Sequence, residues 1–79
     1  MTLDLLPVGR RARIVAIDWS LLVEEEGRRL RALGLDEGAR VAVSHRGVLG
    51  GADPLAVMVG RMTVAVRRAH ARAMRVEAA

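Results

Sequence analysis

The sequence predicts a mainly β fold with short helices: a small, partly open β-barrel of about five strands, with one helix between the first two strands. Apolar residues alternate with polar or small residues in several short segments, as they do in half-buried strands. One segment of about three turns has helical spacing instead. A flat sheet of such short strands would expose its edges, so we expect the sheet to curl toward closure.

Composition limits the core and the sites that the chain can build. Apolar residues make up 52% of it, yet it has one Trp and no Phe or Tyr, so the core must be aliphatic. The lack of Cys excludes disulfides and thiolate metal sites. We expect residues 1–79 to form one domain of marginal size. No signal-peptide pattern and no apolar run of about 20 residues is present, so we expect a cytoplasmic protein.

The first elements are a helical turn and a strand. Thr2 can cap a turn that ends at Leu6, with Leu3 and Leu6 facing the core. A strand is predicted over residues 11–18. One face of it would carry Ala12, Ile14 and Ala16, and the other Arg11, Arg13, Val15 and Ile17.

A helix follows, with Ser20 as its expected N-cap. Its acids, Glu24 to Glu26, precede its arginines, which suits the helix dipole and allows an ion pair between Glu24 and Arg28. Gly34 is expected to end the helix in a left-handed conformation as part of a Schellman motif. Leu35 would then fold back onto Leu30. The apolar stripe consists of Val23, Gly27, Leu30 and Leu33.

The second half of the chain is predicted to be mostly strand. After a turn at residues 36–38, Val41, Val43 and His45 alternate with Arg40, Ala42 and Ser44. A long, glycine-rich connection over 47–54 leads to a hairpin of residues 55–59 and 62–66, with Gly60 and Arg61 as a type II′ turn. A short helix within 68–73 and a strand over 74–77 complete the fold.

Several motifs resemble those of the FeoA family, small bacterial proteins of ferrous iron uptake. RRLRALGLDEGARV, from Arg28 to Val41, is similar to the family signature R-L-x-x-L-G-L-x-x-G-x-x-V. LDLLPVG, from Leu3 to Gly9, resembles the family's opening L-x-x-L-P-x-G, and later motifs follow in the family's order, so the resemblance covers nearly the whole chain. The positions that it marks as structural are Leu30, Leu33, Gly34, Leu35, Gly38, Asp53, Pro54 and Gly60.

The resemblance implies an SH3-like β-barrel with added helices and a non-enzymatic accessory role. It also implies a partner, the FeoB-like membrane permease with its cytoplasmic GTPase domain, and a place at the inner face of the membrane. It implies no metal site in the chain itself. The sequence departs from the family at Trp19 to Leu22, where the family often has glycines, and in the acidity of Glu24 to Glu26.

The residues themselves indicate no catalytic or metal site. His45 and His70 are the only histidines and lack the spacing of metal ligands, so we interpret both as structural or surface residues. Turn chemistry explains the acids at Asp36, Glu37 and Asp53. No glycine-rich phosphate loop is present. We therefore expect no enzyme activity and no cofactor.

Apolar residues outside the predicted strands are the candidates for binding a partner. They are Trp19, Leu21 and Leu22 before the helix, and Val48 and Leu49 in the glycine-rich loop. An equally good interpretation is that they close the ends of the barrel. Trp19 is the stronger candidate, since tryptophan often anchors interfaces.

Two other classes of function remain open. The SH3-like regulatory domain of iron-dependent repressors resembles the FeoA family, and small barrels with net charge +4 can bind nucleic acid. Only Trp19 could stack on a base, and the arginines are mixed with acids, so we expect no nucleic acid partner. The open edges of a small barrel would also allow a homo-oligomer through strand pairing.

Overall fold

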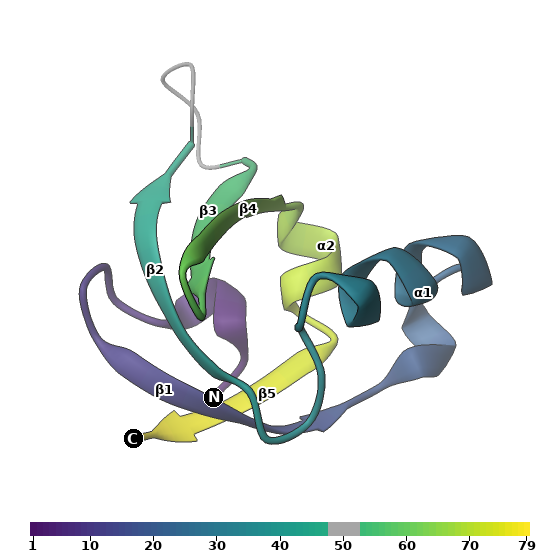
Figure 1. Cartoon of the computed structure of the whole chain (residues 1–79), viewed down its shortest axis with the longest axis horizontal. Coiled ribbons are helices and arrows are strands. Elements are labelled where there is room, and N and C mark those ends of the chain that lie inside the picture. Colours follow the sequence, from purple (N-terminus) through teal and green to yellow (C-terminus); the bar gives the residue numbers. More distant parts are fainter. Residues whose placement is uncertain (48–52) are drawn as a thin grey trace.

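The computed structural model describes residues 1–47 and 53–79, which form a five-stranded antiparallel sheet with short helices (Figure 1). The strands are β1 (Arg11–Ile17), β2 (Arg40–Arg46), β3 (Leu55–Val59), β4 (Met62–Val66) and β5 (Met74–Ala78). The helical segments are η1 (Leu3–Leu5), η2 (Trp19–Leu21), α1 (Glu24–Ala32) and α2 (Arg68–Ala71). The predicted mainly β fold, with its longer helix between the first two strands, is confirmed.

The sheet has the strand order β4-β3-β2-β1-β5 and bends around its core (Figure 1). Within the described residues no ladder joins β4 to β5, so the sheet is curved but open. The edge at β5 is covered by the start of the chain, because the Val76 N–H donates to the Met1 carbonyl at 2.8 Å and Thr2 forms a bridge with Arg75.

Strands β1 and β2 each contain a bulge, and in each strand one predicted face is wrong as a result. In β1 the register shifts between Ile14 and Ala16, so Ile17 rather than Ala16 follows Ile14 on the buried side. In β2 the shift falls between Val43 and His45, which leaves His45 exposed. A bulge inserts one unpaired residue, and every later side chain changes face.

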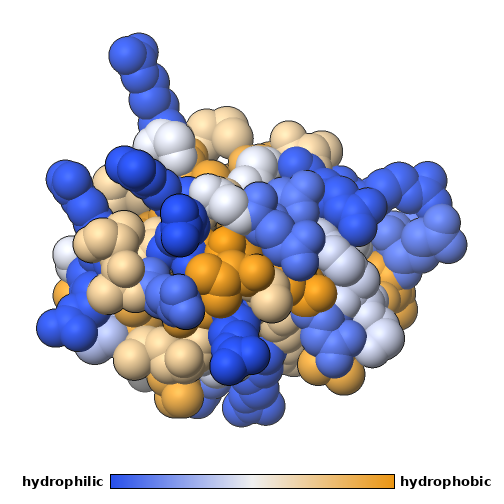
Figure 2. Space-filling view, turned by 90° about the horizontal axis from the view of Figure 1, so that it is seen from below, coloured by the Kyte–Doolittle hydropathy of each residue, from blue (hydrophilic) through white to orange (hydrophobic). Residues whose placement is uncertain are grey.

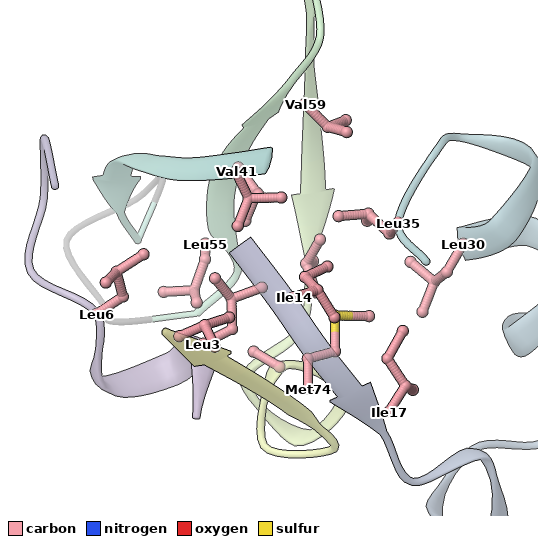
Figure 3. Close-up of a cluster of buried hydrophobic side chains, with 14 of the residues drawn as sticks. Leu3, Leu6, Ile14, Ile17, Leu30, Leu35, Val41, Leu55, Val59 and Met74 are labelled. Carbon is pink, nitrogen blue, oxygen red and sulfur yellow. The ribbon is translucent and has the colours of Figure 1, made fainter. Parts of the chain in front are cut away.

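The core is aliphatic, as predicted, and both η1 and α1 contribute to it. Figure 3 shows leucines of η1 and α1 pointing toward side chains of the strands. Leu3 and Leu6 are buried, as expected. The largest fully buried side chains are those of Leu3, Leu6, Ile14, Leu30, Leu35, Leu55, Met74, Val43, Val57, Val66 and Val76.

Helix α1 ends as predicted but begins differently. Gly34 has φ +96°, and the Leu35 N–H donates to the Leu30 carbonyl at 2.9 Å, which is the Schellman geometry. The prediction of Ser20 as N-cap is wrong, because Ser20 lies within η2 and the N-cap is Val23. The prediction that Val23 belongs to the buried stripe is also wrong, since the residue is 73% exposed.

Local turns position the remaining elements. Gly60 has φ +59° and Val59 pairs with Met62, so β3 and β4 form the predicted two-residue hairpin. The side chain of Asp53 accepts a hydrogen bond from the Arg68 N–H at 2.8 Å, which satisfies a free donor at the start of α2. Asp53 therefore ties the end of the long connection to α2.

Candidate protein-binding site

The short turn η2 determines how the apolar residues before α1 are presented. It starts at Asp18, whose carboxylate accepts hydrogen bonds from the Ser20 N–H at 3.1 Å and from the Ser20 hydroxyl. The Asp18 N–H in turn donates to the Ala73 carbonyl at 2.8 Å. These bonds fix the turn to the segment that joins α2 to β5.

Trp19 lies against α1 and is partly buried. It packs on the hydrophobic core, and the guanidinium of Arg31 lies over its ring at 4.0 Å from the ring centroid. Gly27 lies next to the ring, and a Cβ at that position would be at ordinary contact distance, 3.4 Å, from Trp19 Cε3. A cation over an aromatic face is attracted by the ring quadrupole, worth about 0.5–1 kcal/mol at an exposed site. Trp19 is therefore held in place by contacts within the chain.

The residues next to Trp19 divide between core and surface. Leu22 is buried, at 8% exposure, whereas Leu21 is 63% exposed and Val23 is 73% exposed. Trp19, Leu22 and Val23 line a shallow pocket together with charged residues of α1. We call Trp19, Leu21 and Val23 the apolar surface of η2.

Charged side chains of α1 lie next to this surface, and Figure 2 shows hydrophilic and hydrophobic residues intermixed on the face of the molecule seen there. Glu24 pairs with Arg28 at 3.0 Å, as the sequence predicted, and both side chains are largely exposed. Glu26 accepts from Arg29 at 2.6 Å and lies 3.5 Å from His70 Nδ1. The hydrogen bond from Arg29 is the main cause that lowers the pKa of Glu26, and the charges of His70 and Arg67 act in the same direction. Glu26 thus joins α1 to α2 electrostatically.

The structure brings together only part of the predicted binding set. Trp19 and Leu21 lie at the surface around η2, while Leu22 belongs to the core. Val48 and Leu49 lie outside the described residues. Sequence reasoning missed Val23 and Arg31. The signal for Val23 was its place directly before three acids that all lie in the first turn of the helix, which makes it a cap residue rather than part of the stripe.

The described ranges 1–47 and 53–79 contain no group of three or more His, Asp or Glu residues that could hold a metal ion. His45 is exposed, and its Nδ1 lies 3.3 Å from the Ser44 hydroxyl. In the same part of the chain, no helix combines the length and apolar character needed to cross a membrane.

Solved structures place this architecture among small, mainly β bacterial proteins, one of which is described as an SH3 domain protein. A crystal structure of Stenotrophomonas maltophilia FeoA complexed with zinc, described as a procaryotic SH3 domain protein, is 34% identical and has a TM-score of 0.71. The alignment covers 98% of this chain and 89% of that one. The family model of the FeoA domain matches residues 1–78. The chain belongs to the FeoA family, whose members include ferrous iron transport protein A.

Two further structures support the same fold. FeoA of Chlorobium tepidum is 31% identical with a TM-score of 0.84, over 99% of this chain and 70% of that one. Iron(II) transport protein A of Clostridium thermocellum, at 24% identity, matches the fold with a TM-score of 0.83. The present chain spans 45% of the length of that protein. None of the curated protein sequences compared with the chain matches it.

Proposed function

We propose that this chain is a cytoplasmic accessory protein of bacterial ferrous iron uptake that binds a FeoB-like permease with a GTPase domain. Membership of the FeoA family supports the connection with iron transport. The Stenotrophomonas maltophilia relative is itself described in terms of a role as a bacterial ferrous iron transport activating factor. In this proposal ferrous iron is the cargo of the permease, and the chain has an SH3-like, partly open barrel that presents a binding surface.

The observation that carries the proposal is the apolar surface of η2. Leu21 and Val23 flank the buried Leu22 in sequence and are both exposed, and the partly buried Trp19 carries the guanidinium of Arg31 over its ring. Burying such a side chain fully yields about 1.5–3 kcal/mol relative to leaving it in water. Trp and Arg are the residue types that most often dominate binding energy at interfaces. A preorganised Trp with exposed apolar neighbours is therefore a suitable anchor for a protein partner.

A pull-down tests the proposal. The chain is immobilised, and retention of the cognate permease from detergent extract is measured with GTP, with GDP and without nucleotide. Leu21→Ser is the informative variant, because Leu21 is exposed and its loss should leave the fold intact. We expect it to reduce retention strongly. Val8→Ser is the matched control, since Val8 is also an exposed apolar residue, at 53%, but lies in the turn after η1.

Trp19→Ala should weaken retention as well. Because Trp19 also packs on the core, this variant is interpreted only after its unfolding midpoint has been compared with that of the unmodified chain. Failure of the unmodified chain to retain the permease in any nucleotide state would contradict the proposal and favour a regulatory partner. If the Leu21 and Val8 variants lost retention of the permease equally, the apolar surface of η2 would not be the surface that contacts the permease.

A further inference from the structure

The two edge strands of the sheet, β5 and β4, differ in whether another segment of the chain pairs with their outer side. At β5 the segment around Met1 and Thr2 pairs with Val76 and Arg75, so that edge is covered. Strand β4 pairs with β3 along its whole length, and no other described strand pairs with its outer side. The outer side of β4 is therefore the free edge of the sheet.

The free edge presents backbone groups at two defined positions. In a two-residue hairpin the residues that flank the turn, here Val59 and Met62, form a hydrogen-bonded pair, and pairing then alternates along the strand. By this alternation Val64 also bonds to β3, whereas the N–H and C=O groups of Thr63 and Ala65 point away from the sheet. Both residues are exposed. The edge thus offers two donors and two acceptors to an added strand.

Strand β4 lacks the features that usually prevent strand addition. Natural edge strands are protected by charged side chains, proline or a bulge. The sequence of β4, MTVAV, has neither charge nor proline, and its register with β3 is regular from Leu55–Val66 to Val59–Met62. Met62 is 48% exposed. An unprotected edge on a folded domain is the structural basis of peptide binding by β-augmentation.

Positive charge lies at both ends of this edge. Arg61 precedes β4 and Arg67 follows it, and both are exposed. Arg67 and Ala65 line a shallow pocket together with Arg29, Asp53 and Pro54, so the end of β4 faces a groove with α1 on its other side. Arg29 is paired with Glu26 at 2.6 Å, and the Asp53 carboxylate accepts from the Arg68 N–H. Arg67 forms no ion pair with another described residue, so its charge is available to a ligand.

We propose that the free edge of β4 binds an extended segment of another protein, with an apolar centre and an acidic residue at each end. Both ends of the edge carry an arginine, so the requirement for acids holds whichever way the segment runs. Charge argues against a second copy of this chain as occupant. Antiparallel pairing of two β4 strands about Val64 would place Arg61 of each copy opposite Arg67 of the other, and like charges directly opposite are destabilising.

This inference does not depend on the proposed function, since it concerns different residues from those of the apolar surface of η2. Its test uses two synthetic peptides with blocked ends, ETVTVTE and KTVTVTK, which have the same strand propensity and opposite charge. We expect the acidic peptide to shift the amide resonances of Thr63 and Ala65 in an NMR titration and to slow their hydrogen exchange. The basic peptide should bind at least about tenfold more weakly at low salt, and the difference should shrink as salt is raised.

Three variants separate strand addition from simple charge attraction. Thr63→Pro removes an outward N–H, which an edge strand tolerates, and should abolish binding of the acidic peptide. Arg67→Glu leaves the backbone intact and should weaken that binding by about tenfold. Arg75→Glu makes the same change of net charge on β5, at the opposite end of the strand order from β4, and should have little effect.

Four results would overturn the inference. One is equal binding of both peptides, and another is a set of shifts centred away from β4. The third is concentration-dependent dimerisation that perturbs Thr63 and Ala65, which would identify a second copy as the occupant. Unchanged peptide binding by a folded Thr63→Pro variant would likewise exclude strand addition.

Discussion

The guanidinium of Arg46 donates a hydrogen bond to the main-chain carbonyl of Asp4, with 2.6 Å between Nη1 and the oxygen. Its other terminal nitrogen donates to the Leu6 carbonyl. The bulge at Ser44 makes this possible, because it turns Arg46 to the side on which Leu55 is buried. One side chain at the end of β2 thus satisfies two carbonyls of the η1 region, about 40 residues earlier in the chain.

Replacement of Arg46 by Met should destabilise the fold by about 1–3 kcal/mol, since partly buried carbonyls lose charged donors. Arg46→Lys should recover only part of this, because an ammonium group lacks the two-pronged geometry of the guanidinium. Urea unfolding measures the change. Arg40→Met, an exposed arginine of the same strand, is the control, and an equally large loss there would refute a specific role for Arg46.

Alanine at two glycines of the α1 region should have opposite effects. Gly34 has a positive φ, so Gly34→Ala should cost about 1–2 kcal/mol. Gly27 lies inside α1, and a Cβ there would meet Trp19 at ordinary contact distance, so Gly27→Ala should be neutral or stabilise by up to about 1 kcal/mol. Thermal unfolding compares the two, and destabilisation by Gly27→Ala would mean that the Trp19 ring cannot accommodate the methyl group.

Asp53→Ala should cost about 1 kcal/mol, because the Arg68 N–H at the start of α2 loses its acceptor. Asp53→Asn keeps an oxygen at the same place and should lose less. Hydrogen exchange of the Arg68 amide gives a local readout, and it should become faster in the alanine variant. Unchanged exchange there would show that the amide does not depend on the Asp53 side chain.

The low pKa of Glu26 should make part of the stability depend on pH. A carboxyl group whose folded pKa lies below its unfolded value, about 4.3, stabilises the fold above that pH. The contribution is lost as the pH falls through the folded pKa. Glu26→Gln should therefore be less stable than the unmodified chain near neutral pH, and the difference should diminish below about pH 4.

Urea unfolding across this pH range checks the prediction, with Glu25→Gln, an exposed acid of the same turn, as the control. The effect should also weaken as salt is raised, since the Arg29 side chain is about half exposed. A difference between Glu26→Gln and the unmodified chain that stays constant with pH would rule out a role for the ionised carboxylate.

Features that depend on neighbouring residues could be predicted from the sequence. The Schellman end at Gly34 and the hairpin turn at Gly60 follow from the conformational freedom of glycine beside periodic apolar residues. The faces of Ile17 and His45 could not, because a bulge has no local signature in a strand. The prediction of Ser20 as N-cap was wrong because the Ser20 hydroxyl donates a hydrogen bond to the Asp18 carboxylate instead.

The candidate site likewise combines features that the sequence predicts with features that depend on contacts between separate elements. An apolar cluster around Trp19 and Leu21 was predictable, because these residues lie outside any strand pattern. The inward rotation of Leu22 depends on the turn η2, and the contact of Trp19 with Arg31 depends on how that turn meets α1. Contacts between separate elements are set by packing, which periodicity does not encode.

The bulge in β1 has a consequence for how the chain can change in length. If Val15 were deleted, Ala12, Ile14 and Ile17 would still follow one another on the same face, since the remaining residues regain strict alternation. The strand would lose curvature while its contribution to the core stayed the same. A deletion in a strand normally moves every later side chain to the other face, but removal of Val15 would change the shape of the sheet and leave its interior unchanged.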